Sequence, residues 1–255
     1  MTETFSTTAL LDKSIVVTGA SSGIGRAAAQ LFASCGARVC LVARSRERLL
    51  ATLGSLSGSG HTSHEADIGA IDETATLLQA IGQRDGGISG IFHSAGVGLV
   101  RPSKLIKREQ FDSVLGASLG GAFAIARAAS MKGVMADGGS IALMSSVAAY
   151  RGQIGMALYA ASKGAIDAAT RSLACEFAPR RIRVNSIVSG AVKTEMHERT
   201  SAAMPTEALA AYESKHLLGF GNPSDVAAVA LFLLSDASRW VTGAAWIVDG
   251  GYLAK

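Results

Sequence analysis

Short apolar runs alternate with segments of helical periodicity along the whole chain. The runs predict strands at 14–18, 38–43, a weaker one ending at Asp67, 88–94, 140–144, 182–188 and 244–248. Helices are predicted at 24–34, 46–53 and 72–83, in a long stretch after the fourth strand that ends at 129, and at 157–178 and 224–234. Apolar strands separated by crossover helices are typical of a parallel sheet covered on both faces. The sequence therefore predicts an α/β fold with a doubly wound, seven-stranded parallel sheet.

Length and composition favour one domain spanning residues 1–255, because a chain with 49% hydrophobic residues can build one large core. Three cysteines form no CxxC pair, and the N-terminal MTETFSTTALLDK has no basic region leading into an apolar one. No uninterrupted apolar run reaches the roughly 18 residues of a membrane span. The net charge of +4 comes from interleaved acids and bases, which argues against a nucleic-acid partner. We expect a cytoplasmic protein with no membrane partner.

A glycine-rich stretch, TGASSGIG at 18–25, follows the first predicted strand. Glycine permits a tight turn and lets the main chain approach a pyrophosphate, whose charge is favoured at the N-terminus of the next helix. The spacing differs from the commoner GxGxxG fingerprint, so an ordinary strand-to-helix turn is the alternative.

Basic residues follow the second predicted strand, where a site for NAD would present an acid to the ribose 2′-hydroxyl. The chain offers Arg44, Arg46 and Arg48, and a guanidinium there would pair with the 2′-phosphate of NADP. The alternative is that these arginines only begin a helix. We expect NADP as the cofactor, with NAD as the second choice. Asp67 and Ile68, after the third strand, suit adenine binding, although an isolated Asp67 would more often cap a helix.

The segment YAASK places Tyr159 four residues before Lys163, so both share one face of a helix. A nearby ammonium group favours the phenolate, and we expect Lys163 to lower the pKa of Tyr159 toward the working pH. A phenol tuned in this way is a usable general acid and base.

These motifs together resemble the classical short-chain dehydrogenases/reductases. TGASSGIG, Asp67, the serine pair at 145–146, YAASK and the late VDGG at 248–251 occur in the order of that family. The resemblance implies a Rossmann fold and an enzyme that interconverts a carbonyl and a secondary alcohol with hydride from the nicotinamide. It assigns Tyr159 as proton donor, Ser146 as the hydroxyl that stabilises the substrate oxygen, and Lys163 as the partner of the nicotinamide ribose. Ser145 would support this arrangement.

The resemblance also implies a set of cofactor contacts and three departures from the family pattern. Besides Tyr159 and Lys163, the cofactor contacts would be Gly19, Ser21, Ser22, Gly23, Ile24, Gly25, Arg44, Asp67, Ile68, Ser94, Ala95, Gly96, Gly190, Val192 and Thr194. Ser118 replaces an asparagine that holds a relay water, so the catalytic role of Ser118 is a hypothesis. Ser94 replaces a bracing asparagine. Ser189 replaces a proline, which predicts a looser turn after the sixth strand.

Residues 195–220 are expected to form a variable substrate lid, with a neutral, partly apolar substrate. Candidate apolar contacts there are Met196, Met204, Leu209, Tyr212, Leu217 and Leu218. The family commonly forms tetramers, and we expect one here. The rival hypothesis is a nucleotide-binding scaffold or regulator with weak catalysis, supported by the three serine departures.

The histidines show no metal-ligand spacing, and no metal is expected. His93 ends a strand at the cofactor edge, where a structural role is favoured over a catalytic one. MSSVA lacks the G-x-S-x-G elbow of a serine hydrolase, which argues against that class.

Overall fold

The computed structural model describes residues 5–202 and 204–255. Residues 1–4, the start of the polar N-terminal segment, and residue 203, in the predicted lid, lie outside the described residues. Seven strands form one parallel sheet in the order β3-β2-β1-β4-β5-β6-β7. Their bounds are β1 Ser14–Thr18, β2 Arg38–Ala43, β3 Thr62–Glu65, β4 Ile88–His93, β5 Met135–Ser146, β6 Arg183–Ser189 and β7 Ala245–Val248. The predicted fold class is confirmed.

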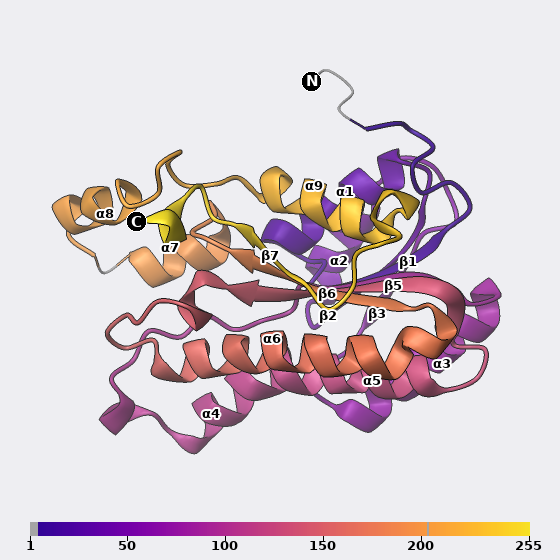
Figure 1. Cartoon of the computed structure of the whole chain (residues 1–255), viewed down its shortest axis with the longest axis horizontal. Helices are drawn as coiled ribbons and strands as arrows, with labels where there is room; N and C mark the ends of the chain where they lie inside the picture. Colours follow the sequence, from indigo (N-terminus) through magenta and orange to yellow (C-terminus); the bar gives the residue numbers. More distant parts are fainter. Residues whose placement is uncertain (1–4, 203) are drawn as a thin grey trace.

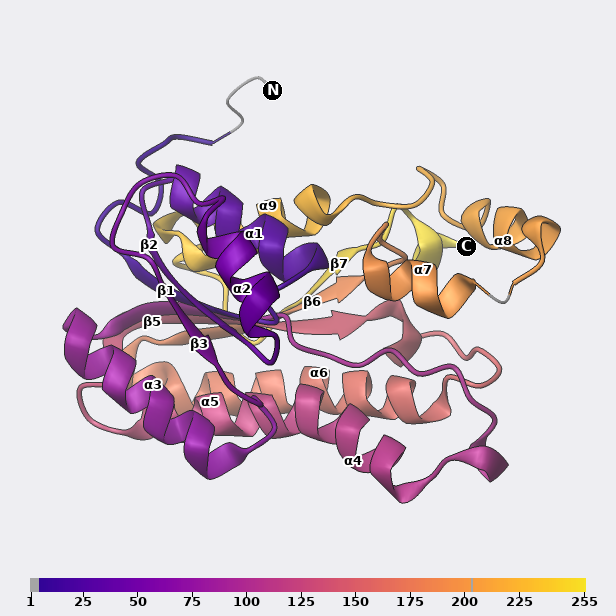
Figure 2. The same ribbon diagram turned by 180° about the vertical axis from the view of Figure 1, so that it is seen from behind.

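Helices cover both faces of the sheet. The bounds are α1 Gly23–Ser34, α2 Arg46–Leu53, α3 Ile71–Asp85, α4 Arg108–Leu115, α5 Gly121–Ser130, α6 Ala157–Phe177, α7 Glu195–Ser201, α8 Thr206–Glu213 and α9 Pro223–Leu234. Helices α1, α2 and α9 lie over one face, and α3 to α6 lie over the other (Figures 1 and 2). Two apolar clusters fill the space between the layers, one on each side of the sheet. Strands β1 and β6 are buried along their whole length for this reason.

Strand β5 is longer than its apolar run predicts. It extends back to Met135, which pairs with Ile88 before a register shift, and forward to Ser146, which pairs with Ser189. Ladder hydrogen bonds join backbone groups, so polar residues such as those of the MADGG segment can extend a strand that hydropathy alone would end.

The order of the strands reverses between β1 and β4. The chain proceeds outward from β1 through β2 to β3, and then returns to place β4 on the other side of β1. Ligands of open α/β sheets bind at such a switch point, beyond the carboxyl ends of the strands. The loops that follow β1, β2 and β4 therefore surround the position where a dinucleotide is expected.

Helices α4 and α5 are joined by a π-helical segment, Gly116–Gly120, into one continuous stretch. Among the described residues, this stretch, Arg108–Ser130, is the one helix with the length and mean hydropathy of a membrane span. Half of its most apolar window is buried, and α5 packs against α3 and α6. Packing onto the sheet accounts for this apolar character, because core helices have the same composition.

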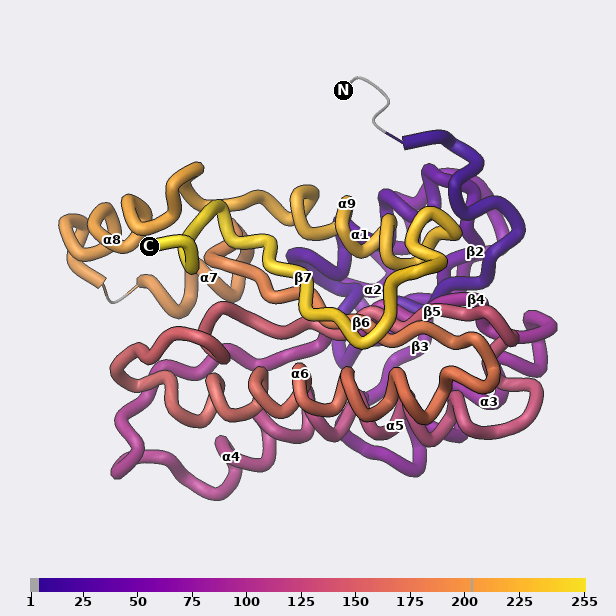
Figure 3. The backbone as a smooth tube through the Cα atoms, in the orientation of Figure 1, coloured from indigo at the N-terminus to yellow at the C-terminus, as the bar shows by residue number. Residues whose placement is uncertain are grey.

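The segment predicted as a lid contains α7 and α8, which lie at the end of the sheet toward which the arrowheads of β5 and β6 point (Figure 2). The C-terminal residues lie beside the same two helices (Figure 3). The last turn, Tyr252–Ala254, is therefore close to the predicted lid, although 38 residues separate it from the end of α8 in the sequence.

Candidate active site

The glycine loop between β1 and α1 has the shape that a pyrophosphate requires. Gly19 has a φ of +66°, and a Cβ there would lie 2.8 Å from the backbone nitrogen of Ala95. A Cβ on Gly25 would lie 2.3 Å from the carbonyl oxygen of Gly19, so only glycine lets α1 begin this close to the strand. The N-cap side chain, Ser22, makes no cap hydrogen bond. The amide groups at the start of α1 are thus free to bind an anion.

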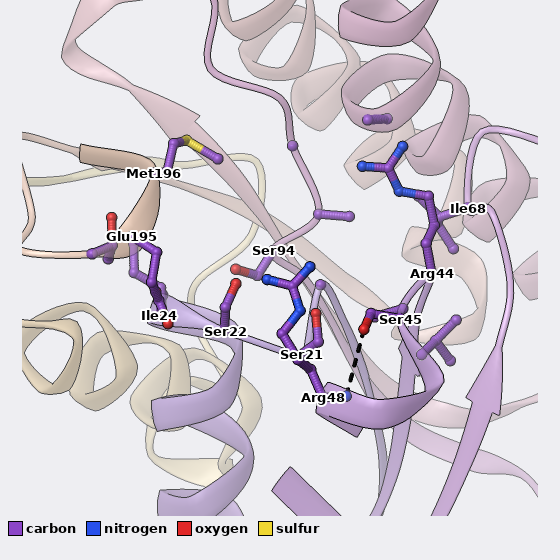
Figure 4. A pocket seen from close by; sticks show the side chains of 18 of the residues that line it. Ser21, Ser22, Ile24, Arg44, Ser45, Arg48, Ile68, Ser94, Glu195 and Met196 are labelled. Atoms are coloured by element: carbon purple, nitrogen blue, oxygen red, sulfur yellow. Dashed lines mark hydrogen bonds between the residues drawn. The ribbon is translucent and has the colours of Figure 1, made fainter. Parts of the chain in front are cut away.

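A cavity of about 550 Å³ runs along this loop (Figure 4). Its lining includes most of the predicted cofactor contacts: Gly19, Ser21, Ser22, Gly23, Ile24, Arg44, Asp67, Ile68, Ser94, Ala95, Gly96 and Thr194. Gly25 does not line the cavity and instead packs against Gly19. Its role as a cofactor contact stays a prediction; the structure shows that its lack of a side chain lets α1 pack closely beneath the loop.

The end of β2 supplies positive charge to the same cavity. Arg44 and Arg48 line it, whereas Arg46 does not, and Arg199 of α7 adds a third guanidinium. Figure 4 shows Arg44 on the far side of the pocket from Glu195 and Met196. The β2 end itself, Ala43 and Arg44, offers no carboxylate to a ribose 2′-hydroxyl.

A second cavity, of about 160 Å³, adjoins the first, and both are lined by Ile24, Ser94, Gly96, Thr194 and Met196. The three predicted catalytic side chains, Ser146, Tyr159 and Lys163, all line this second cavity. Gly190 and Val192 also line it, which accounts for the rest of the predicted cofactor loop after β6. The structure thus brings the catalytic candidates together in a cavity that adjoins the predicted dinucleotide cavity.

Two neighbouring elements position the catalytic candidates. Ser146 is the last residue of β5, where its hydroxyl accepts a hydrogen bond from the amide of Ala148 at 3.2 Å. Tyr159 and Lys163 lie in the first two turns of α6, one above the other as the i, i+4 spacing predicts. The Lys163 ammonium group donates to the carbonyl of Met144 at 2.9 Å and lies 5.6 Å from the centroid of the Tyr159 ring.

Burial changes the pKa of both members of this pair. It raises the pKa of Tyr159 above its ordinary value, although the hydroxyl of Ser146 acts in the opposite direction. It lowers the pKa of Lys163 to about 8, with Asp167 opposing the change. The expectation that Lys163 lowers the pKa of Tyr159 is therefore wrong for the chain by itself, because the ammonium group binds the Met144 carbonyl and faces the ring rather than the hydroxyl.

Ser145 has the supporting role predicted for it. Its hydroxyl donates to the carboxylate of Asp167 at 2.9 Å and is 3.2 Å from the carbonyl of Lys163. Ser186 of β6 donates to the other oxygen of Asp167 at 2.6 Å. A buried carboxylate with two donors ties α6 to the two strands beneath it, and this fixes the helix that carries Tyr159 and Lys163.

His93 is buried, and both of its ring nitrogens are engaged. Nε2 donates to the carbonyl of Ser118 at 2.9 Å, so Nδ1 accepts from the hydroxyl of Thr18 at 2.8 Å. Burial lowers its pKa to about 4, which keeps the ring neutral at pH 7. The predicted structural role is confirmed: His93 joins β1, β4 and the π-helical segment. Gly121 leaves room for the ring, since a Cβ there would lie 2.5 Å from Cε1.

Ser118 is fully buried in the π-helical segment, and its hydroxyl has no hydrogen-bond partner among the described residues. It lies 3.8 Å, and the Lys163 ammonium group 3.4 Å, from the position that a Cβ on Gly96 would take. The two polar groups therefore approach the same small space, which no side chain fills at Gly96. The catalytic role of Ser118 stays a prediction.

The turn after β6 is held by hydrogen bonds despite Ser189 in place of proline. Gly190 donates to the carbonyl of Val248 at 3.0 Å, and Ala191 donates to Nε2 of His216 at 3.2 Å. Val192 also forms a parallel bridge with Gly221. The expected loosening of this turn is not observed, because tertiary contacts replace the constraint of the proline ring.

Several residues that line the catalytic cavity were not assigned to the site from the sequence. Gln153, His197 and Thr200 line it, as does Tyr212, which was expected only as an apolar contact of the lid. Of the other lid candidates, Met196 lines the cavity, while Leu217 and Leu218 are exposed. Arg199 was also missed. No motif marks these positions, because the sequence of a loop or helix does not show which of its side chains point toward a cavity.

Comparisons with known proteins agree with this geometry. Residues 19–253 match a family model described as enoyl-(acyl carrier protein) reductase. The chain is 36% identical over 238 residues to carbonyl reductase family member 4 of Danio rerio, covering 92% of this chain and 96% of that protein. A crystal structure of a short-chain dehydrogenase/reductase from Brucella melitensis, described as glucose/ribitol dehydrogenase, superposes with a TM-score of 0.88 at 32% identity and covers 97% of this chain and 99% of the other. A short-chain dehydrogenase from Burkholderia cenocepacia in complex with NADP gives 0.87 at 28% identity, with 96% and 99% covered.

The fold and the site define a dinucleotide-dependent oxidoreductase. The chain belongs to the short-chain dehydrogenase/reductase family. The uncapped start of α1 and the cavity along the glycine loop fit the pyrophosphate of an NAD(P) cofactor, which supplies the hydride in this chemistry.

Proposed function

We propose that this protein catalyses the NADP-dependent interconversion of a ketone and a secondary alcohol. In the reducing direction, a hydride passes to the carbonyl carbon and a proton to the carbonyl oxygen, so NADPH, a proton and the ketone give NADP⁺ and the alcohol. The observation that carries the proposal is the meeting of Ser146, Tyr159 and Lys163 in a cavity that adjoins the glycine-loop cavity.

Each catalytic side chain has a distinct task in this proposal. Tyr159 donates its phenolic proton to the substrate oxygen, and its raised pKa keeps that proton in place at neutral pH. Ser146 donates a hydrogen bond to the same oxygen as negative charge develops there. Lys163 would bind the ribose of the nicotinamide and hold a positive charge beside the phenol.

The preference for NADP rests on the guanidinium groups near the end of β2. Arg44 and Arg48 line the cavity on the side where the adenosine ribose is expected, and no acid from β2 competes with them. The Burkholderia cenocepacia relative with NADP bound supports the same choice.

Steady-state assays with NADPH and NADH over a panel of ketones test the function. We expect turnover that is lost by at least about a thousandfold in Tyr159→Phe, since the general acid is removed. Arg44→Ala should raise the KM for NADPH at least about tenfold and change that for NADH little. Equal turnover by the wild type and Tyr159→Phe would contradict the proposal.

The rival function, a dinucleotide-binding scaffold with weak catalysis, is favoured by one observation: Ser118 stands where the family has an asparagine, and its hydroxyl has no hydrogen-bond partner among the described residues. Tight NADPH binding in a fluorescence titration, together with no oxidation across the panel, would support that function instead.

A further inference from the structure

The catalytic cavity has a polar wall that the proposed reaction does not use. Gln153, from the loop between β5 and α6, and Tyr212, from α8, line the cavity together with Tyr159. Lys163 is the only lysine, arginine, aspartate or glutamate among the described residues that line it. The wall therefore offers hydrogen bonds to a neutral substrate.

An aromatic cluster holds Tyr212 in place. Its ring lies 5.2 Å from that of His216, 5.5 Å from that of Phe220 and 6.0 Å from that of Tyr252, measured between centroids. His216 is itself fixed, because Nε2 accepts from Ala191 and Nδ1 faces the carbonyl of Tyr212 at 3.2 Å. No residue of α8 is fully buried, so this cluster positions the Tyr212 ring relative to the cavity.

The amide of Gln153 has a fixed orientation. Its Nε2 donates to the hydroxyl of Tyr252 at 2.8 Å. Tyr252 is buried, its ring lies 5.0 Å from the Arg151 guanidinium, and its carbonyl accepts from that group at 3.2 Å. With the nitrogen directed at Tyr252, the oxygen Oε1 is left as an acceptor, and no described residue donates a hydrogen bond to it.

Tyr212 supplies the complementary donor. Burial raises the pKa of its phenol above the ordinary value, and the Gln153 amide acts in the opposite direction. The group therefore keeps its O–H at neutral pH. Tyr212 and Tyr159 line the same cavity, so this donor borders the space that the reacting carbonyl would occupy.

We propose that Tyr212 and Gln153 bind a hydroxyl group that the substrate carries near its reacting carbon, so that the substrates are neutral hydroxy ketones and, in reverse, diols. A hydroxyl both donates and accepts, and so pairs with the Gln153 oxygen and the Tyr212 O–H at once, whereas a second carbonyl would satisfy the donor alone. An alkyl group would offer neither the Gln153 oxygen nor the Tyr212 O–H a hydrogen bond. This inference rests on the proposed ketone reductase activity.

Matched ketones separate the hydroxyl from the rest of the substrate. Hydroxyacetone differs from butanone, and 1-hydroxyhexan-2-one from heptan-3-one, by a hydroxyl in place of a methyl group. We expect the wild type to prefer the hydroxy ketone of each pair in kcat/KM by roughly 10- to 100-fold. Tyr212→Phe, which keeps the ring and its packing, should abolish most of that preference, because kcat/KM falls much further for the hydroxy ketone than for the plain ketone.

Two further variants complete the test. Gln153→Met, of similar length without an amide, should reduce the same preference. Ser214→Ala removes an exposed hydroxyl just after α8 that lines neither cavity, and should change neither the preference nor the turnover. A melting temperature for each variant shows that the fold is intact.

The outcomes distinguish this inference from the function on which it rests. Equal wild-type turnover of both members of each pair, or an equal loss on both in Tyr212→Phe, would overturn the hydroxyl assignment and leave the ketone reductase standing. A preference for 3-oxoacyl thioesters over every hydroxy ketone would do the same. No turnover of any carbonyl compound would overturn the proposed function and this inference with it.

Discussion

Lys163 combines a positive charge with deep burial, and this sets a pH limit on the proposed reaction. Its side chain is 4% exposed, and burial lowers its pKa to about 8. The neighbouring phenol, Tyr159, has a raised pKa and stays protonated over the same range. Loss of the lysine charge is therefore the first ionisation of this pair that rising pH produces.

We expect kcat for ketone reduction to fall as the pH rises through about 8, because Lys163 then loses its proton and its charge. A pH–rate profile between pH 6 and 10 under saturating NADPH measures this. Lys163→Arg keeps its charge over that range, so its lower activity should lack the fall near pH 8. A wild-type profile that is flat to pH 10 would contradict the assignment.

The neutral state of His93 predicts an acid-sensitive fold. Its pKa is about 4 in the folded chain against an ordinary 6.5, so the unfolded chain binds the proton more tightly. Above pH 6.5 the neutral ring makes its full contribution to the free energy of unfolding. As the pH falls toward 4 this contribution is lost, and the loss is at most roughly 3 kcal/mol. Urea unfolding at pH 7 and 4.5 should show a larger loss in the wild type than in His93→Gln. Equal losses would argue against a buried neutral ring.

At the scale of elements, the site depends on how closely α1 begins to β1. Gly25 lies under the loop, where a Cβ would meet the Gly19 carbonyl at 2.3 Å. Gly164, in α6, has no atom within 4 Å of its Cβ position among the described residues, and its φ is not positive. Packing therefore requires a glycine at position 25, whereas a methyl group would fit at position 164.

Gly25→Ala should raise the Kd for NADPH at least about tenfold, because the loop must move to admit the methyl group. Gly164→Ala serves as the matched control and should stabilise the chain by about 0.5–1 kcal/mol with unchanged cofactor binding. Fluorescence titration and urea unfolding give the two quantities. Normal NADPH binding by Gly25→Ala would show that the loop tolerates the displacement.

At the scale of the molecule, the β7 edge of the sheet presents apolar side chains to solvent. Trp240 is 97% exposed and Ile247 is 56% exposed, and both line one shallow hollow at this edge. Exposed apolar surface at a sheet edge is typical of an interface between subunits. The expected tetramer offers a reason for this surface.

Light scattering coupled to size-exclusion chromatography should give the mass of a tetramer for the wild type. Trp240→Lys combined with Ile247→Lys should shift the protein to smaller species, since two charges would be buried at the contact. Leu50→Lys, at a residue of α2 that is 51% exposed, is the control. A monomeric wild type would exclude this interface.

Features that depend on local pattern could be predicted from the amino-acid sequence. The order of strands and helices, the glycine loop and the pairing of Tyr159 with Lys163 follow from periodicity and from spacings of a few residues. Even the departure at Ser118 could be located, because its motif has a fixed place in the chain.

Contacts between residues far apart in sequence, and the charges that burial controls, depend on how the chain packs in three dimensions. His93 meets Thr18 across 75 positions, and Gln153 meets Tyr252 across 99. Neither pair has a spacing that a pattern can report. The raised pKa of Tyr159 has the same origin, since desolvation by the folded chain exceeds the effect expected from the adjacent lysine. The sequence therefore specified the proposed reacting groups, while the packing of α8 and the C-terminal turn specified the polar wall of the cavity that they line.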